Sequence, residues 1–260
     1  MIKKSSEKKL AIYITAGLPT VSASVEIARA AISAGADIIE LGVPFSDPTA
    51  DGKTIQRASQ KALERGIDLS KTFSIARKLK NAGADVYLMS YLNPLTAYGA
   101  KRLDTDTISA DVSGFIIPDL TPDSAASMRR KGLPLPEKIV YLAAPNTPAA
   151  RLKKIAASSS GFVYAVSLFG VTGARRETAP RPPAKFLEKL RALSAGKPVL
   201  AGFGVSSPAR AAALAEFADG VIIGSAVMEI IENTPARRAP EAVGDFVAAC
   251  KKAIKKKRSR

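Results

Sequence analysis

Short apolar runs rich in β-branched residues recur along the whole chain, and each is followed by a polar or glycine-containing loop. The runs are continuously apolar rather than alternating, which is typical of parallel strands that are covered on both faces. Every interval between them is long enough to hold a helix. The pattern predicts eight strands, at residues 11–15, 37–41, 86–90, 114–120, 138–144, 161–167, 198–204 and 220–225.

Helical spacing lies between the predicted strands. Residues 21–32 place Val21, Val25 and Ala28 on one apolar stripe, and Gly35 follows as the expected helix end. Eight strand and helix units favour an α/β fold of the single (β/α)8 TIM barrel type. An open doubly wound sheet usually has fewer strands and a glycine-rich first turn, which is missing here.

Two segments depart from regular spacing. The long intervals after Glu40 and after Tyr164 carry extra loop sequence, and long loops after strands are where a barrel keeps its chemistry. Residues 100–113 have few large apolar side chains, which predicts a short or frayed element rather than a regular helix.

Length and composition bound the remaining possibilities. The chain has 260 residues, which suits one barrel domain over residues 1–260 with a core at about 10–250. Histidine is absent and Cys250 is the one cysteine, which excludes Ser-His-Asp triads, zinc-finger spacings and internal disulfides, so no metal site is expected. No run approaches the ~20 apolar residues that span a bilayer, and no signal peptide is evident, so we expect a cytoplasmic protein without a membrane partner.

The net charge of +16 is concentrated at the two ends of the chain. Residues 251–260 hold seven basic and no acidic residues, and residues 1–9 hold four lysines and one glutamate. Such runs are usually solvated tails, so 251–260 is interpreted as a basic tail and nucleic acid is not expected as the main partner. A phosphorylated small molecule is compatible with the positive field.

Carboxylates provide the candidate chemistry. Glu40 lies near the end of an otherwise apolar strand, where a charge is costly unless it has a function or a partner. Asp47 and Asp51 follow in a loop that can fold back over the strand ends, and two carboxylates in unlike environments can serve as an acid/base and as an ionised stabiliser of positive charge. The alternatives are a Glu40 that faces the helices beside a structural cation, and aspartates that only form turns. Asp119 is interpreted as a turn and helix cap.

Glycines after the last three strands predict a phosphate site. Glycine lets backbone N–H groups approach phosphate oxygens, a helix N-terminus favours an anion, and a barrel often builds its phosphate site from these late loops. The candidate residues are Gly173, Gly202, Gly204, Gly224 and Ser225.

Aromatic side chains near the strand ends could line an apolar slot for a planar ring. The candidates are Tyr13, Tyr91, Tyr164 and Phe203, each of which could equally be core packing. Together with the carboxylates and the phosphate site, they indicate acid-base chemistry on a phosphate ester that carries a flat apolar group.

These residues resemble the tryptophan synthase alpha chain family. The most specific motif is Glu40-Leu-Gly-Val-Pro-Phe-Ser-Asp-Pro-Thr-Ala-Asp-Gly52, and the other motifs follow the family's order between residues 10 and about 232. The resemblance implies a lyase of tryptophan biosynthesis that cleaves indole-3-glycerol phosphate to indole and glyceraldehyde 3-phosphate by a retro-aldol step.

The resemblance also implies roles for single residues. Glu40 resembles the catalytic acid/base, and Asp51 resembles the carboxylate that holds the indole N–H. Tyr164 is similar to the family's active-site tyrosine, and Thr172 to the threonine of a loop that closes over the site. The remaining matches are similar to phosphate binders, namely Gly173, Gly204, Gly224 and Ser225.

The resemblance implies a partner beta chain, which carries pyridoxal phosphate in an alpha2beta2 assembly, and no cofactor on this chain. Leu18 stands where the family commonly has an acidic residue linked to beta-chain contact, and most of the family's leading helix is missing before the first strand. Two alternatives stay open. One is the synthase that closes the indole ring, although no strand interior offers the lysine that its chemistry would use. The other is a binding protein that keeps the phosphate site without turnover.

Overall fold

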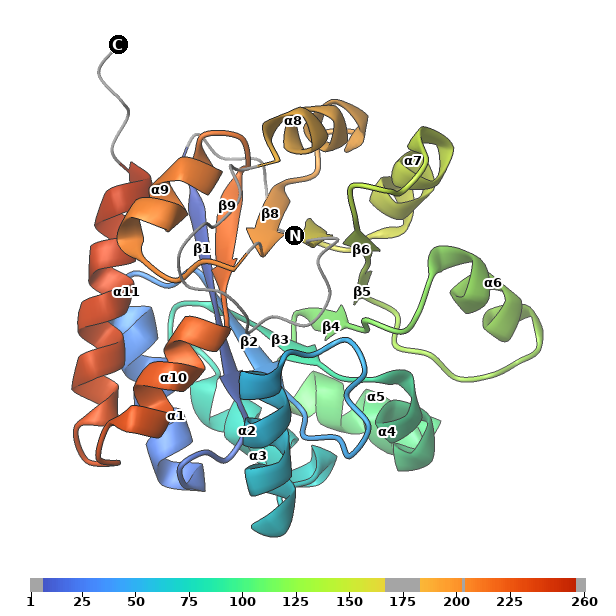
Figure 1. The fold of residues 1–260 in the computed structure, drawn as a ribbon. Helices are drawn as coiled ribbons and strands as arrows, with labels where there is room; N and C mark the ends of the chain where they lie inside the picture. Colours follow the sequence, from blue (N-terminus) through green and yellow to red (C-terminus); the bar gives the residue numbers. More distant parts are fainter. Residues whose placement is uncertain (1–6, 167–182, 203, 256–260) are drawn as a thin grey trace.

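The computed structural model describes residues 7–166, 183–202 and 204–255. One or two helices follow most strands from β1 to α11, and the strands surround a common centre with the helices outside them (Figure 1).

The strands form one parallel sheet in the order β5, β4, β3, β2, β1, β9, β8, β7, β6. The edge strands β5 and β6 are consecutive in the chain and are separated by Tyr141 alone, so the sheet closes on itself as a barrel. Tyr141 itself is paired with β7, because the backbone N–H of Tyr164 donates to its carbonyl at 3.2 Å. The predicted TIM barrel and all eight predicted strands are confirmed, with the fifth strand in two pieces. Their bounds are β1 Lys9–Thr15, β2 Ile38–Gly42, β3 Asp85–Met89, β4 Gly114–Ile116, β5 Ile139–Val140, β6 Leu142–Ala143, β7 Val163–Val166, β8 Val199–Gly202 and β9 Gly220–Ile223.

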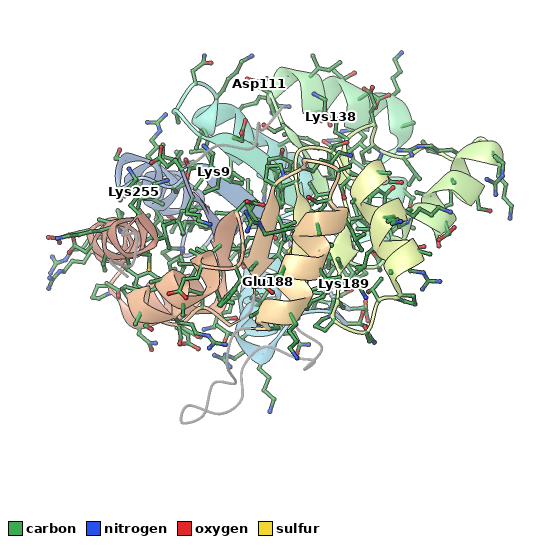
Figure 2. The ribbon with its side chains drawn as sticks, turned by 90° about the horizontal axis from the view of Figure 1, so that it is seen from above. Lys9, Asp111, Lys138, Glu188, Lys189 and Lys255 are labelled. Carbon is green, nitrogen blue, oxygen red and sulfur yellow. The ribbon has the colours of Figure 1, made fainter. Side chains whose placement is uncertain are left out.

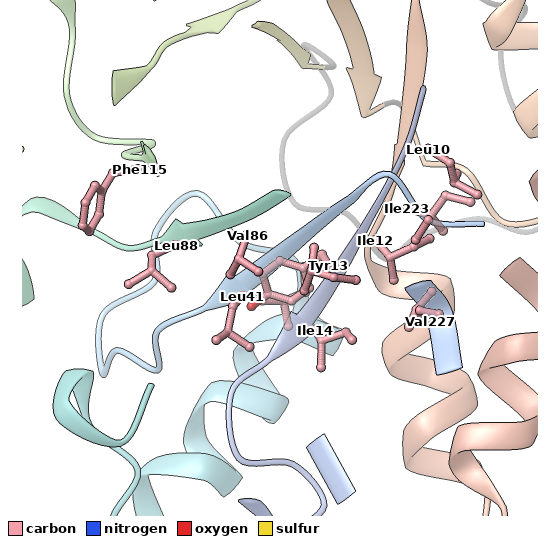
Figure 3. Packing of buried hydrophobic residues seen from close by; sticks show 14 of the residues in the cluster. Leu10, Ile12, Tyr13, Ile14, Leu41, Val86, Leu88, Phe115, Ile223 and Val227 are labelled. Carbon is pink, nitrogen blue, oxygen red and sulfur yellow. The ribbon is translucent and has the colours of Figure 1, made fainter. Parts of the chain in front are cut away.

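Alternate strand residues pack in two separate layers. Inside the barrel, each strand except β6, or the residue just before it, contributes one buried side chain to a single cluster, and the partly buried Leu142 of β6 packs against it. The residues between them belong to a second, larger cluster shared with the helices; Figure 3 shows part of it, with Ile12 and Ile14 of β1 and Val227 of α10. Both faces of each strand are therefore apolar, as the continuous runs predict. The inner cluster is Ala11, Ile38, Tyr87, Ile116, Val140, Phe162, Leu200 and Ile222.

The helices follow the strands and cover the outside of the barrel. The predicted first helix is confirmed: Thr20 caps its N-terminus by accepting from the N–H of Ala23, and the chain turns at Gly35 with φ +105°. The helix bounds are α1 Val21–Ser33, α2 Lys53–Glu64, α3 Leu69–Leu79, α4 Leu92–Tyr98, α5 Ala100–Ser109, α6 Pro122–Arg130, α7 Ala149–Ser158, α8 Ala184–Leu193, α9 Pro208–Ala215, α10 Ser225–Asn233 and α11 Ala239–Lys255.

The prediction of a short or frayed element at residues 100–113 is wrong, because α5 is a regular helix of ten residues. It buries only Leu103, while Ile108 is 77% exposed. Polar contacts also join it to its neighbours: Asp106 accepts hydrogen bonds from Arg77 of α3 and from the hydroxyl of Tyr98 in α4. A count of apolar residues alone therefore does not predict a helix that also forms an ion pair with a neighbouring helix.

The boundary of the predicted basic tail also needs correction. Residues 251–255 form the last turn of α11. Lys251 is 8% exposed, and its Nζ lies 2.6 Å from a carboxylate oxygen of Asp37, while Ile254 is buried. Lys255 pairs with Glu7 at 2.8 Å, so the two basic ends of the chain meet on one side of the barrel, where Figure 2 shows Lys9 and Lys255.

Within the described residues, no helix is both long and apolar enough to cross a membrane.

Asp219 provides a test of what holds the barrel together. Its carboxylate is 8% exposed and accepts from the Arg191 side chain at 2.8 and 3.1 Å and from the N–H of Val199 at 3.0 Å. We expect Asp219→Ala to lower the free energy of unfolding by about 2 to 3 kcal/mol, because it leaves partly buried donors unpaired. Urea unfolding measures this. Asp123→Ala is the control, because it breaks an exposed pair with Lys154 and should change little; equal effects of the two substitutions would contradict the assignment.

Candidate active site

Glu40 lies inside the barrel. It is on the same face of β2 as Ile38, which belongs to the inner cluster, and its register partners are Tyr13 on β1 and Tyr87 on β3. The alternative of a Glu40 that faces the helices is thereby excluded. The side chain is 1% exposed, and neither carboxylate oxygen has a hydrogen-bond partner in the described part of the chain.

Burial in this apolar interior and, to a smaller extent, the charge of Asp51 together raise the pKa of Glu40 to about 8. A carboxyl group with this pKa is mostly protonated at neutral pH. It can therefore donate a proton, and the carboxylate that remains can accept one.

Asp51 comes from the loop between β2 and α2 and is 7% exposed. The loop is held in place by its own contacts: the amide of Gln56 donates to the Asp51 carbonyl at 2.9 Å, and the N–H of Ala50 donates to the Tyr91 hydroxyl at 2.8 Å. Burial raises the pKa of Asp51 to about 6, although a hydrogen bond from Tyr91 opposes the shift. Asp51 is thus mainly ionised at pH 7 while Glu40 is mainly neutral, which gives the two carboxyl groups unlike states.

The other two acidic candidates lie elsewhere. Asp47 is exposed and accepts a hydrogen bond from Ser46. Asp119 accepts from the N–H of Leu92 at 3.0 Å and so caps α4. The prediction that Asp119 caps the helix that follows it in the chain is wrong, because Thr121 caps that helix.

Tyr13, Tyr91 and Tyr164 gather around the two carboxyl groups. Burial raises the pKa of Tyr13 and Tyr164 well above the ordinary value, with further contributions from Asp51 and Glu40. Tyr91 follows β3 and is the N-cap of α4. The centroid of its ring lies 5.2 Å from the ring centroid of Phe45. These hydroxyls therefore stay protonated across the working pH range.

The glycines predicted for a phosphate site lie at the ends of two adjacent strands. Gly202 ends β8, and Gly204 has φ +55° with nothing within 4 Å of an added Cβ. Gly224 is the N-cap of α10, and no side chain caps this N-terminus, so the N–H groups that begin at Ser225 can bind an anion. Thr172, Gly173 and Phe203 lie outside the described residues.

Sequence reasoning missed part of the inner wall. Tyr87 and Phe162 contact each other edge to face at 5.3 Å inside the barrel, and both are buried. Gly42 was also unrecognised as a site feature, although a Cβ there would lie 2.2 Å from the Tyr13 hydroxyl. Counting alternate positions from Glu40 would have placed Gly42 on the inner face of β2, whereas Tyr87 and Phe162 belong to other strands, whose register the sequence leaves open.

Comparisons with known proteins identify the family of this chain. The family model described as tryptophan synthase alpha chain matches residues 1–257. The chain belongs to the tryptophan synthase alpha chain family. The family member from Roseiflexus is 42% identical over 252 residues, covering 95% of this chain and 94% of that protein. The member from Xanthomonas campestris is 40% identical over 256 residues, covering 97% and 94%.

Solved structures show the same fold. Tryptophan synthase from Mycobacterium tuberculosis matches with a TM-score of 0.82 at 35% identity, covering 96% of this chain and 94% of that one. The tryptophan synthase alpha chain from Legionella pneumophila matches with a TM-score of 0.81 at 35% identity, covering 95% and 92%. The family match covers Glu40 and Asp51, which are both buried in this barrel.

Proposed function

We propose that this chain is the alpha subunit of a tryptophan synthase and cleaves indole-3-glycerol phosphate to indole and glyceraldehyde 3-phosphate. The observation that carries the proposal is the Glu40 carboxyl group, which is buried inside the barrel of a family member without a hydrogen-bond partner among the described residues. A neutral carboxyl group in that position is suited to give its proton to a substrate carbon.

The reaction needs one proton to be given and one to be taken. Glu40 protonates the indole ring carbon that bears the glycerol chain, and the positive charge that develops on the ring is stabilised by ionised Asp51 at the indole N–H. The Glu40 carboxylate then removes the proton of the adjacent glycerol hydroxyl. The carbon-carbon bond breaks, its electrons restore the aromatic indole, and the hydroxyl carbon becomes the aldehyde. Glu40 ends the cycle protonated, as it began.

The other candidates bind the substrate. Tyr13, Tyr91 and Tyr164 line the site of the indole ring, and Phe203, which lies outside the described residues, is assigned the same role from its place in the sequence. Thr172, which lies outside the described residues, is assigned the role of orienting Asp51, as the family resemblance implies. Backbone N–H groups hold the phosphate with help from the N-terminus of α10. The phosphate binders are Gly173, Gly202, Gly204, Gly224 and Ser225.

The partner is a tryptophan synthase beta chain. Pyridoxal phosphate belongs to that chain, and the alpha chain family carries no cofactor of its own. Leu18, which replaces a commonly acidic residue, is 6% exposed and packs within the alpha chain. We also propose a cytoplasmic location, which is supported by the buried free thiol of Cys250.

An indole-release assay tests the proposal. We expect the purified chain to release indole from indole-3-glycerol phosphate slowly alone and faster with a beta chain, because that partner receives the indole product. Absence of indole when a competent beta chain is present would contradict the proposal. Binding of glycerol phosphate without turnover would instead support a binding protein.

A further inference from the structure

Two hydroxyl groups of β1 bind each other beside Glu40. Tyr13 and Thr15 are two residues apart on the strand, so their side chains share a face. The Tyr13 hydroxyl lies 3.1 Å from Oγ1 of Thr15, and the two residues are 4% and 0% exposed.

The Tyr13 ring is fixed over Gly42 of the neighbouring strand. A Cβ at position 42 would lie 2.2 Å from the Tyr13 hydroxyl oxygen and 2.5 Å from the ring carbon that carries it. Gly42 therefore provides space for the phenol, two residues beyond Glu40 on the same face of β2. The ring leans along β2 in this way, and its hydroxyl reaches Thr15, the register partner of Gly42.

The Tyr13 hydroxyl is a hydrogen-bond donor next to an unpartnered acid. Tyr13 and Glu40 are register partners on adjacent strands. The titratable groups around Glu40 are Asp51 from the β2–α2 loop, Tyr13 on β1, Tyr164 on β7 and Tyr87 on β3. Burial and the charge of Asp51 raise the pKa of Tyr13, so its hydroxyl keeps its proton. A hydrogen bond from this hydroxyl to Glu40 would favour the ionised carboxylate.

We propose that Thr15 is a positioning residue that binds the Tyr13 hydroxyl, so that this hydroxyl does not donate to Glu40. The inference rests on the proposed function, in which Glu40 works as a proton donor. In this role the Tyr13 hydroxyl donates to Oγ1 of Thr15, so that its proton is not available to Glu40 and the acid stays neutral. The role acts through Tyr13, and Thr15 itself does not touch the reacting atoms.

Direct titration of Glu40 tests the inference on the full chain. The carboxyl carbons of glutamate are labelled with ¹³C, and Glu40→Gln identifies the Glu40 signal. We expect Thr15→Val to lower the midpoint of Glu40 by about one pH unit, because the freed hydroxyl turns to the carboxylate. Thr15→Ser keeps a hydroxyl and should restore the wild-type midpoint. In a Tyr13→Phe background, which has no donor, Thr15→Val should leave the midpoint unchanged.

Two results would overturn the inference. One is a folded Thr15→Val variant with the wild-type midpoint, and the other is a shift that persists in the Tyr13→Phe background. Because Thr15 is fully buried, Thr15→Ala serves as a second variant without the hydroxyl. The titration needs no turnover, so a wild-type chain that releases no indole would reject the proposed function and leave this result readable.

Discussion

Replacing Glu40 with glutamine is expected to reduce the rate of indole formation by about a thousandfold while the barrel stays folded. The amide has nearly the shape of the neutral carboxyl group, so packing inside the barrel is kept. It has no acidic proton for the indole ring carbon, and it does not accept the proton of the glycerol hydroxyl. Single-turnover formation of indole in the presence of the beta chain measures the effect.

Glu64→Gln is the matched control for this variant. Glu64 is an exposed residue at the end of α2, so the same chemical change there should leave the rate unaltered. A Glu40→Gln variant that retains activity within tenfold of the wild type would remove Glu40 from the mechanism, and circular dichroism excludes unfolding as the cause of a loss.

The stability of the protein should fall as pH rises from about 4.5 to 8, and Glu40→Gln should abolish most of this dependence. The folded state holds the Glu40 proton up to a pKa of about 8, whereas an ordinary glutamate has 4.5. Over this range the unfolded chain binds fewer protons than the folded chain, so the free energy of unfolding decreases with pH. The loss is on the order of 3 kcal/mol, because each unit of pKa difference corresponds to about 1.4 kcal/mol and relaxation reduces the full shift.

Urea unfolding of both proteins at pH 5, 7 and 8.5 measures this difference. The wild type should lose stability relative to Glu40→Gln at each step. Asp51, with a pKa of about 6, contributes in the same direction below pH 6 in both proteins and so largely cancels. Parallel stability curves for the two proteins would show that Glu40 is already ionised in the folded state at pH 5.

The strands could be predicted from the sequence because both of their faces are buried. Each run between polar loops is apolar at inner and outer positions alike, as in Ile38 and Ile39, and this leaves an unambiguous signal. The division of the fifth strand could not be predicted. It arises at Tyr141, whose N–H donates to the Ser159 hydroxyl at 3.1 Å, and this contact depends on a residue from a later loop.

The sequence predicts the part of the site in which a charged side chain lies among apolar residues. A carboxylate in an apolar strand, as at Glu40, is visible in sequence because burial penalises it. The hydrogen bond between Asp119 and the N–H of Leu92 could not be predicted, because it joins the loops after two different strands. The contact between Tyr13 and Gly42 was hidden for a similar reason: it depends on strand register, which the apolar runs leave open.

The pH dependence of a single turnover tests the central claim most directly, namely that the protonated carboxyl group of Glu40 starts the cleavage of indole-3-glycerol phosphate. With saturating substrate, the rate of indole formation should be level near pH 7 and fall about tenfold for each pH unit above about 8, as the acid form is lost. A rate that stays constant from pH 7 to 10 would contradict the account.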